Sequence, residues 1–496
     1  MAMGFSQVEG IDYGETHASV MSSKSFRILL ALWNLGKNLS MEHWDVKNAF
    51  VNAPLDEIIY LHPVPGYEGK GGAGKIFKLK KALYGCKQAA FQWQKFLSEI
   101  FLQMGATRHL NDECVYIFRE GNGWLLLGTH VDDIFPLFNP EGRKLRDKIF
   151  SALQKKMTLE NKGTLSFALD TKIERDAEAG ILKISQPAYI AGIISDFNAE
   201  NALKSRDNPS SGPEISEEVL PQTDEEKQKA SKLPIRNLIG RLWWLALVSR
   251  PDIVCALHKC AIWQNKPSLF LWRKLGHIVQ YLAGTASLGL VYTRPKLPFS
   301  KENPLFSAMC DSSYASEPGS RSRIGWFFNV AGGLVSWDTK VSTRVMTSTT
   351  EAECHGLVAL GKENIWQRDF QNVLGFFKNV GPTIVFQDNS AAIRLATGCK
   401  VHKRSKHFGV EFNSFREYVD LKEIEIIHRS TDDLAADMLT KSLPAEKFQR
   451  FRDMVMGDHT KQDFFLSRRE RGGGGPTQGR FSAHTQRGGG FASSRA

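Results

Sequence analysis

The sequence lacks the features of membrane, secreted and disulfide-stabilised proteins. No apolar run reaches the roughly 18 residues that a membrane-spanning helix needs. The N-terminus has no basic-then-apolar pattern of a signal peptide. The seven cysteines are odd in number and include no CxxC pair, which argues against a disulfide framework and for a reducing compartment. We therefore expect no membrane partner and no structural disulfides.

Two motifs that would indicate a bound phosphate or metal are incomplete. The glycine-rich stretch at 69–74 holds no GxxxxGK[ST] pattern, so we do not interpret it as a phosphate-binding loop. Cys255, His258 and Cys260 lie close together in the sequence, but the other half of a zinc site is missing. A buried helical face explains these three residues better.

A basic excess is the main compositional signal. The 496 residues carry a formal net charge of +11, with a pI near 9.2. This excess favours a polyanionic partner such as nucleic acid, and it is also compatible with simple solubility. Lysines alternate with aromatic residues between 75 and 93, which indicates either a nucleic-acid track or the solvated face of a strand and helix.

Periodicity predicts a chain of mixed helices and strands. Helices are predicted at 25–33, 92–104, 143–156, 185–197, 238–262, 272–281, 349–375 and 389–397. Strands are predicted at 41–50, 306–310, 324–330, 333–337 and 383–387, with a short extended piece at 60–65. The Pro-, Ser- and charge-rich stretch at 207–232 is the best candidate for an internal linker.

Asp132 and Asp133 lie between two apolar runs, which predicts a hairpin with both carboxylates at its tip. Neighbouring carboxylates repel unless a cation neutralises them, and Mg²⁺ prefers such oxygen ligands. The alternative is a solvated Asp-Asp turn. A third carboxylate would favour the metal site, and Asp45 is plausible because an unpaired Asp on an apolar strand is costly. Spacing alone does not select Asp45 among the acidic residues.

Several motifs of the first half resemble the reverse transcriptase of copia-type LTR retrotransposons. These motifs occupy residues 5–7, 10–16, 44–50, 78–89, 92–93 and 131–133. Residues 238–242, 250–253 and 281–285 extend the similarity beyond the linker, although Ile235 stands where the family usually has Tyr. The resemblance implies an α+β right-hand polymerase with a palm, partial fingers and a thumb or connection region.

The resemblance also implies roles for individual residues of this half. Asp45, Asp132 and Asp133 would hold two Mg²⁺ ions, with Mn²⁺ as an alternative, for nucleotidyl transfer by in-line displacement. Phe50 falls where the family places an aromatic gate that selects deoxynucleotides. The other substrate-binding positions, which shape the nucleotide pocket and contact the template, are Tyr84, Gly85, Lys87 and Gln88.

The second half resembles the copia-type RNase H domain, which implies an α/β RNase H-like fold. Its four acidic positions are Asp311, Glu353, Asp388 and Asp437. Four such groups would bind two Mg²⁺ ions for cleavage of the RNA strand of an RNA–DNA hybrid. Glu351 is the rival of Glu353, and helical spacing keeps these two residues off one face. His407 either helps to order substrate or product release, or is a structural histidine.

The motifs predict five regions. Residues 1–205 are expected to form the fingers and palm, truncated at the N-terminus, and 206–232 a linker. Residues 233–300 are expected to form thumb or connection helices, 301–456 an RNase H-like domain, and 457–496 a disordered Gly/Arg-rich tail.

The leading hypothesis is an RNA-directed DNA polymerase with RNA–DNA hybrid ribonuclease activity, from a retrotransposon Pol polyprotein. Its expected partners are an RNA template, a DNA primer, an RNA–DNA hybrid and deoxynucleoside triphosphates. Self-association or contact with other polyprotein products is also expected. The expected location is the cytoplasm, within a virus-like particle for an active element, or the nucleus.

The alternative is a decayed or co-opted copy that binds nucleic acid, or only cleaves RNA–DNA hybrids, without polymerising. Three departures from the family pattern motivate it. His130 replaces the usual Tyr before Val-Asp-Asp, and residues 88–91 lack the family's Pro and Arg. The basic fingers strand that family members carry ahead of Phe5 is also missing.

Overall fold

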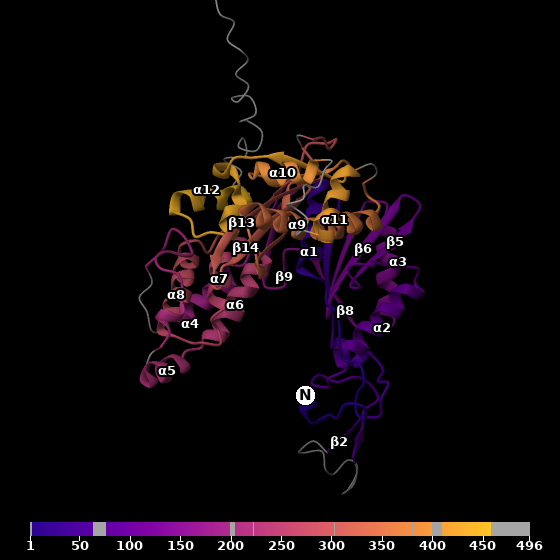
Figure 1. Ribbon diagram of the computed structural model, residues 1–496. Helices are drawn as coiled ribbons and strands as arrows, with labels where there is room; N and C mark the ends of the chain where they lie inside the picture. The colour runs from indigo at the N-terminus through magenta and orange to yellow at the C-terminus, as the bar shows by residue number, and fades with distance from the viewer. Residues whose placement is uncertain are drawn as a thin grey trace, which may run out of the picture. The chain divides into compact units, whose positions relative to one another are not determined.

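The structure is a computed structural model that describes residues 2–62, 76–198, 204–221, 223–301, 303–377, 380–398 and 409–457 (Figure 1). The described chain forms three larger sheets with helices packed on them. Strands β2 (Tyr60–Leu61) and β3 (Phe77–Lys78) pair as a separate antiparallel two-stranded sheet. The predicted glycine-rich turn at 69–74 and the predicted tail lie outside the described residues.

The first sheet contains six antiparallel strands in the order β4-β5-β6-β7-β1-β8. These strands are β1 (Ser40–Val46), β4 (Thr107–Arg108), β5 (Val115–Glu120), β6 (Gly123–His130), β7 (Asp133–Phe138) and β8 (Leu159–Thr164). The helices that accompany it are α1 (Ser23–Leu35), α2 (Ala89–Gln103) and α3 (Arg143–Gln154).

The central strands of this first sheet are buried on both faces, whereas the edge strands β4 and β8 are largely exposed. Strand alternation decides which face each side chain reaches. Trp44 of β1 and Ile134 of β7 pack into one core with α2 and α3, whereas Phe135 packs into the other core with α1. Neighbours along a strand point to opposite faces. Asp45 and Asp133 therefore share the face on which α1 packs.

The middle of the chain contributes a four-stranded sheet in the order β12-β11-β10-β9 and a group of helices. The strands are β9 (Phe167–Ala168), β10 (Thr171–Asp176), β11 (Ile181–Ser185) and β12 (Gly289–Thr293). The helices are α4 (Pro187–Asn198), α5 (Asp224–Ser231), α6 (Ile235–Val248), α7 (Val254–Ala261) and α8 (Leu269–Gly284).

One sequence prediction is corrected in this middle part, and a second stretch contains a helix that was not predicted. The single helix predicted at 238–262 is wrong, because a 3₁₀ turn (η4, Pro251–Ile253) separates α6 from α7. Proline has no N–H to donate and clashes with the preceding turn. The stretch expected as a linker contains α5, whose start is fixed by a capping box between Thr223 and Glu226. The domain boundaries themselves stay predictions.

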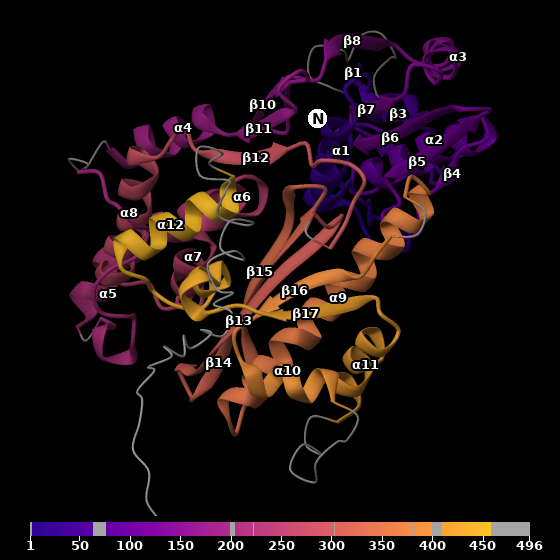
Figure 2. The same cartoon turned by 90° about the horizontal axis from the view of Figure 1, so that it is seen from above.

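The last sheet has five strands in the order β15-β14-β13-β16-β17, with parallel pairing of β13 with β16 and of β16 with β17 (Figure 2). The strands are β13 (Phe306–Glu317), β14 (Arg321–Val330), β15 (Gly333–Val345), β16 (Thr383–Gln387) and β17 (Ile424–His428). The helices are α9 (Thr349–Leu374), α10 (Ser390–Thr397), α11 (Gly409–Asp420), the 3₁₀ helix η7 (Ala435–Leu439) and α12 (Ala445–Met456).

Close approaches show that α9 and η7 cover opposite faces of this sheet. A Cβ on Gly356 of α9 would lie 3.7 Å from Ile324, whereas a Cβ on Gly325 would lie 2.4 Å from the Cβ of Leu439 in η7. Ile324 and Gly325 are neighbours on β14, so their substituents point to opposite faces. Glycine at 325 thus allows η7 to approach the sheet closely.

The predicted fold class is confirmed, with an α+β first part followed by an α/β last part. The helices predicted around 25–33, 92–104, 143–156 and 349–375 are present, as is the hairpin around Asp132. Elements β8 to β12, β17, α11 and α12 were not predicted. Within the described ranges, no helix is both long and apolar enough to cross a bilayer.

Candidate active sites

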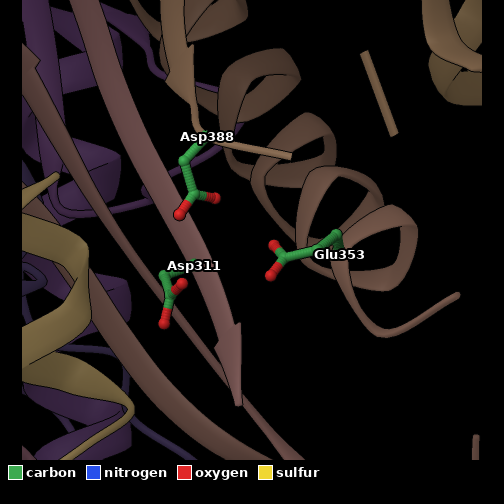
Figure 3. Close-up of side chains that lie close together, drawn as sticks. All are labelled: Asp311, Glu353 and Asp388. Carbon is green, nitrogen blue, oxygen red and sulfur yellow. The ribbon is translucent and has the colours of Figure 1, made fainter. Parts of the chain in front are cut away.

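Three acidic side chains meet beside strands β13 and β16 of the last sheet, near the start of α9. Asp311 lies on β13, Asp388 directly follows the parallel strand β16, and Glu353 lies near the start of α9. Met309 of β13 is in register with Phe386 of β16. Asp311 and Asp388 each lie two residues further along, so the same parallel register sets them side by side. One carboxylate oxygen from each acidic residue lies within 4.8 Å of the other two. Figure 3 shows Glu353 pointing from its helix toward the two aspartates, and we call these residues the carboxylate trio.

Hydroxyl groups and a lysine hold the two aspartates of the trio. Thr431 Oγ1 donates to Asp388 Oδ2 at 2.6 Å, and Thr440 Oγ1 donates to Asp311 Oδ2. Lys441 Nζ lies 3.3 Å from Asp311 Oδ2. The sequence analysis did not predict these three partners. Thr440 and Lys441 could have been found, because they belong to the same motif as Asp437.

The electrostatics of the trio favour a cation. Burial raises the pKa of Asp311 to about 6, with Lys441 opposing the rise and Asp437 adding to it. Burial, and then the charges of Asp311 and Asp388, raise the pKa of Glu353 well above its usual range. Three carboxylate oxygens at this spacing, two from buried residues and one from the partly buried Asp388, are the hard donors that Mg²⁺ takes, and the ion would offset their repulsion. The residues present therefore fit the predicted Mg²⁺.

Asp437, the fourth predicted acidic residue, lies beside the trio without joining it. Its Oδ1 lies 2.7 Å from Lys441 Nζ, and its Oδ2 lies 2.8 Å from Lys447 Nζ. Lys441 also contacts Asp311, so it bridges Asp437 to the trio. Of the four acidic residues predicted for this site, the structure gathers three and leaves the fourth as an ion-paired neighbour.

The structure also separates Glu353 from its rival Glu351. The Glu351 carboxylate accepts hydrogen bonds from the N–H and the hydroxyl of Thr347, both at 2.7 Å. It thereby helps Ser348, the N-cap residue, to fix the start of α9. Glu353 is the residue that reaches the trio, as the motif indicated.

The raised pKa of Asp311 predicts a pH dependence of stability. The carboxyl keeps its proton up to about pH 6 in the folded protein, against an ordinary value of 3.8. Because the folded state binds this extra proton, the metal-free protein should lose unfolding free energy as pH rises from about 4 to about 6. Urea unfolding in EDTA across this range measures the effect. Asp311→Asn should make the unfolding free energy depend less steeply on pH. If the pH dependence stays unchanged, Asp311 does not have the raised pKa.

The second acidic group lies at the tip of the β6–β7 hairpin, where the turn residue Val131 has a φ of +54°. Asp45 is in register with Asp133, and the N–H of the residue after Asp45 donates to Asp132 O at 2.8 Å. The Trp93 indole N–H donates to Val131 O at 2.5 Å and secures the turn against α2. The structure therefore places the three predicted polymerase aspartates at one end of the sheet.

Basic side chains are the partners of these aspartates in the structure. Lys162 Nζ lies 2.9 Å from Asp45 Oδ1, Lys47 Nζ lies 3.0 Å from Asp45 Oδ2, and His43 Nε2 lies 2.5 Å from Asp133 Oδ1. Burial alone would raise the pKa of Asp45, but the two lysines outweigh it and lower that pKa. Among described residues, these aspartates do not form a group with donor atoms within 4.8 Å. The lysine partners were not predicted.

Phe50, the predicted gate, lies next to the hairpin tip. Its ring centroid is 4.5 Å from that of Tyr84. Phe50 also lines a cavity of about 30 Å³ together with Trp93 and Val131. His130, in the position of the family's Tyr, is partly buried, and burial lowers its pKa although Asp133 opposes the change.

The N-terminal segment secures the predicted nucleotide-pocket motif. Ala2 N donates to Tyr84 O at 2.8 Å, and Lys87 N donates to Gln7 Oε1 at 2.8 Å. The Gln7 Nε2 group donates in turn to Gln88 Oε1 at 3.1 Å, and Gln88 is buried. Two motifs that are far apart in the sequence thus form one structural unit, which the sequence did not predict.

Gly85 is the tightest point of this unit, and Gly85→Ala should destabilise the protein. Its φ is +99°, and a Cβ would lie 2.1 Å from Ala2 O. Gly163→Ala is a matched control, because Gly163 has a φ of +86° but no atom within 4 Å of the added carbon. We expect Gly85→Ala to cost at least about 1 kcal/mol more than the control in urea unfolding. Equal losses would show that the contact with Ala2 is unimportant.

Two further predictions concern residues outside these sites. His407 lies outside the described residues, and its role stays a prediction. Cys255 and Cys260 are buried on α7, and His258 Nδ1 accepts from the Arg323 guanidinium at 3.1 Å. The buried helical face predicted for these three residues is confirmed for the two cysteines, and His258 is partly buried.

Comparison with known proteins gives a family match for the first part of the chain. Residues 1–208 match the family described as reverse transcriptase (RNA-dependent DNA polymerase). The chain is 32% identical over 455 residues to the retrovirus-related Pol polyprotein from transposon TNT 1-94 of Nicotiana tabacum, which covers 91% of this chain and 33% of that protein. The chain thus spans about a third of the length of this relative and of two Arabidopsis thaliana Pol polyproteins, from transposons RE2 and RE1, to each of which it is 27% identical.

The similar solved structures are more distant. The foamy viral protease-reverse transcriptase in complex with RNA/DNA hybrid matches 81% of this chain and 45% of its own, with 13% identity and a TM-score of 0.41. RNase H1 from Halobacterium salinarum NRC-1 matches 27% of this chain and 93% of its own, with 18% identity and a TM-score of 0.20. The reverse transcriptase match over residues 1–208 and the Pol polyprotein relatives show that this chain is similar to the reverse transcriptases of copia-type retrotransposons.

Proposed function

We propose that the carboxylate trio cleaves the RNA strand of an RNA–DNA hybrid with the help of Mg²⁺. One observation carries this proposal. Three acidic side chains from β13, α9 and the end of β16, two of them buried and Asp388 partly buried, bring their oxygens within 4.8 Å of one another. Similarity to a reverse transcriptase family supports the choice of substrate, because copying RNA into DNA produces such a hybrid.

In this proposal the chain's own residues hold the ion and shape the charge around it. Asp311, Glu353 and Asp388 would be its ligands. Bound Mg²⁺ would activate a water molecule and stabilise the leaving 3′-oxygen. The hydroxyls that donate to Asp311 and Asp388 hold those carboxylates in place. Lys441, between Asp311 and Asp437, stabilises the negative charge on both residues.

The second candidate function is RNA-directed DNA polymerisation at the hairpin tip. It is favoured by the register that pairs Asp45 with Asp133 and by the family match over residues 1–208. Asp45, Asp132 and Asp133 would hold Mg²⁺ or Mn²⁺, and Lys47 and Lys162 would have to release Asp45 first. Deoxynucleoside triphosphates and a primed template are the substrates that this site would take.

One assay series tests both functions in the full chain. Cleavage of an RNA–DNA hybrid and primer extension on RNA and DNA templates are measured with Mg²⁺, with Mn²⁺ and with EDTA. We expect metal-dependent cleavage, and extension that Asp132→Asn abolishes while cleavage continues. Cleavage without extension would support the copy that only degrades hybrids. Hybrid binding without either activity would support a copy that only binds nucleic acid.

A further inference from the structure

We propose that Gln387 is a positioning residue that sets the place of Glu353 relative to Asp388 in the carboxylate trio. The inference rests on the proposed metal-dependent function of the trio. Gln387 ends β16, immediately before Asp388, and its side chain is fully buried. Neither charge nor metal ligation explains a buried primary amide at this point of the fold.

Both ends of this amide are occupied. Gln387 Oε1 accepts from the N–H of Asp388 at 2.8 Å and from the N–H of Asn389 at 3.0 Å. Its Nε2 group donates to Glu353 Oε2 at 3.2 Å and contacts Cys310 Sγ at 3.3 Å. One side chain therefore touches all three segments that carry the trio: the end of β16, α9, and β13 next to Asp311.

The hydrogen bonds fix the orientation of the amide. Two backbone N–H groups require an acceptor at one end, which is the oxygen, so the NH₂ group must face Glu353. This donor holds the Glu353 carboxylate at a fixed place beside Asp388. Gln387 thus links the turn that carries Asp388 to the carboxylate on the helix.

The side-chain length suits this link. Gln387→Asn keeps an amide oxygen near the two N–H groups but is one methylene shorter, so its NH₂ group would not reach Glu353. Gln387→Met keeps the length and volume but has no N–H donor and no good acceptor. The two variants remove the same hydrogen bond to Glu353 in different ways. Gln371→Met is the matched control, because Gln371 is also buried, on α9, and both polar atoms of its side chain lack a hydrogen-bond partner.

The test is Mg²⁺ binding to the full chain, measured by isothermal titration calorimetry at pH 7.5, with unfolding temperature in EDTA as the check on folding. The Mg²⁺ binding that is lost in Asp388→Asn is taken as the binding at the trio. We expect Gln387→Met and Gln387→Asn to weaken that part by at least about tenfold, as loss of a side chain that orients a metal ligand does. Gln371→Met should leave it unchanged. In hybrid cleavage, both Gln387 variants should need more Mg²⁺ for half-maximal rate, while the rate at saturating Mg²⁺ falls much less.

Each outcome decides a separate question. If the wild-type protein shows no Mg²⁺ binding that Asp388→Asn removes, the proposed function fails. If that binding is present but both Gln387 variants retain it within about twofold, the positioning role alone is overturned. If Gln387→Met does not fold, Gln387→Asn decides, since it keeps an acceptor for the backbone N–H groups.

Discussion

Asp388→Asn should reduce cleavage of an RNA–DNA hybrid by on the order of 10²–10³-fold or more, the loss expected when a preorganised charged group is removed from an active site. The substitution keeps the size of the side chain and removes one of the three carboxylates that converge within 4.8 Å. Thr431 Oγ1 donates to Asp388 Oδ2, and the hydroxyl can rotate to another acceptor after the change. We therefore expect loss of activity with little loss of stability.

The measurement is the initial rate of cleavage of a labelled hybrid at saturating Mg²⁺, with the unfolding temperature recorded beside it. Asp420→Asn is the control, because this carboxylate is exposed at the end of α11. It should change neither quantity. Hybrid cleavage that survives Asp388→Asn at the wild-type rate would remove the trio from the reaction.

The second large effect concerns stability, and Asp252→Ala should cost about 3–5 kcal/mol. Asp252 and Arg250 form an ion pair in which both side chains are 0% exposed, with 2.7 Å between Arg250 Nη2 and Asp252 Oδ2. The Tyr281 hydroxyl donates to the same Asp252 oxygen at 2.6 Å, and Arg250 donates to Thr285 O and Oγ1. Removing the carboxylate leaves a buried guanidinium without its counter-charge and a buried phenol without its acceptor.

The loss is measured as the shift of the urea unfolding midpoint at constant slope. Asp224→Ala is the matched control, since Asp224 pairs with Lys227 on a fully exposed part of α5. Surface pairs of this kind contribute about 0–1 kcal/mol. If the two variants lose similar stability, the buried network contributes no more to the fold than an exposed ion pair does. The network also joins the motif that contains Arg250 to the motif that contains Tyr281, so the two motifs form one structural unit.

The sequence predicted the elements whose apolar pattern is strong. The α9 helix and the strands around Asp132 carry long apolar or periodic runs, and both were found close to their predicted bounds. Strand β8 was missed because most of its side chains are polar and exposed, so no alternation marks it. Strand β17 is short and only partly buried, and its pairing with β16 is a tertiary contact that local patterns do not encode.

The sequence predicted which residues belong to the candidate sites, but not how their side chains are arranged. The motifs named all three members of the trio, because each lies in a short characteristic stretch. They did not show that Asp437 is held by Lys441 and Lys447, or that Lys47 and Lys162 take the oxygens of Asp45. Such ion pairs depend on long side chains that meet only in the folded chain. The role of Gln387 was not predicted for the same reason, since its partner Glu353 lies on a different element.

The parallel pairing of β13 with β16 has a consequence for how the protein folds. Cys310 and Gln387, which meet beside the trio, are 77 residues apart in the chain, and α9 must cross between their strands before they can pair. Non-local pairing of this kind is slow, because a long loop has to be closed before any contact offsets the entropy lost. A chain emerging from the ribosome would complete its hairpin tip early and its trio late. Asp311 would therefore leave the ribosome well before Asp388, and the trio would form only after both strands had been made.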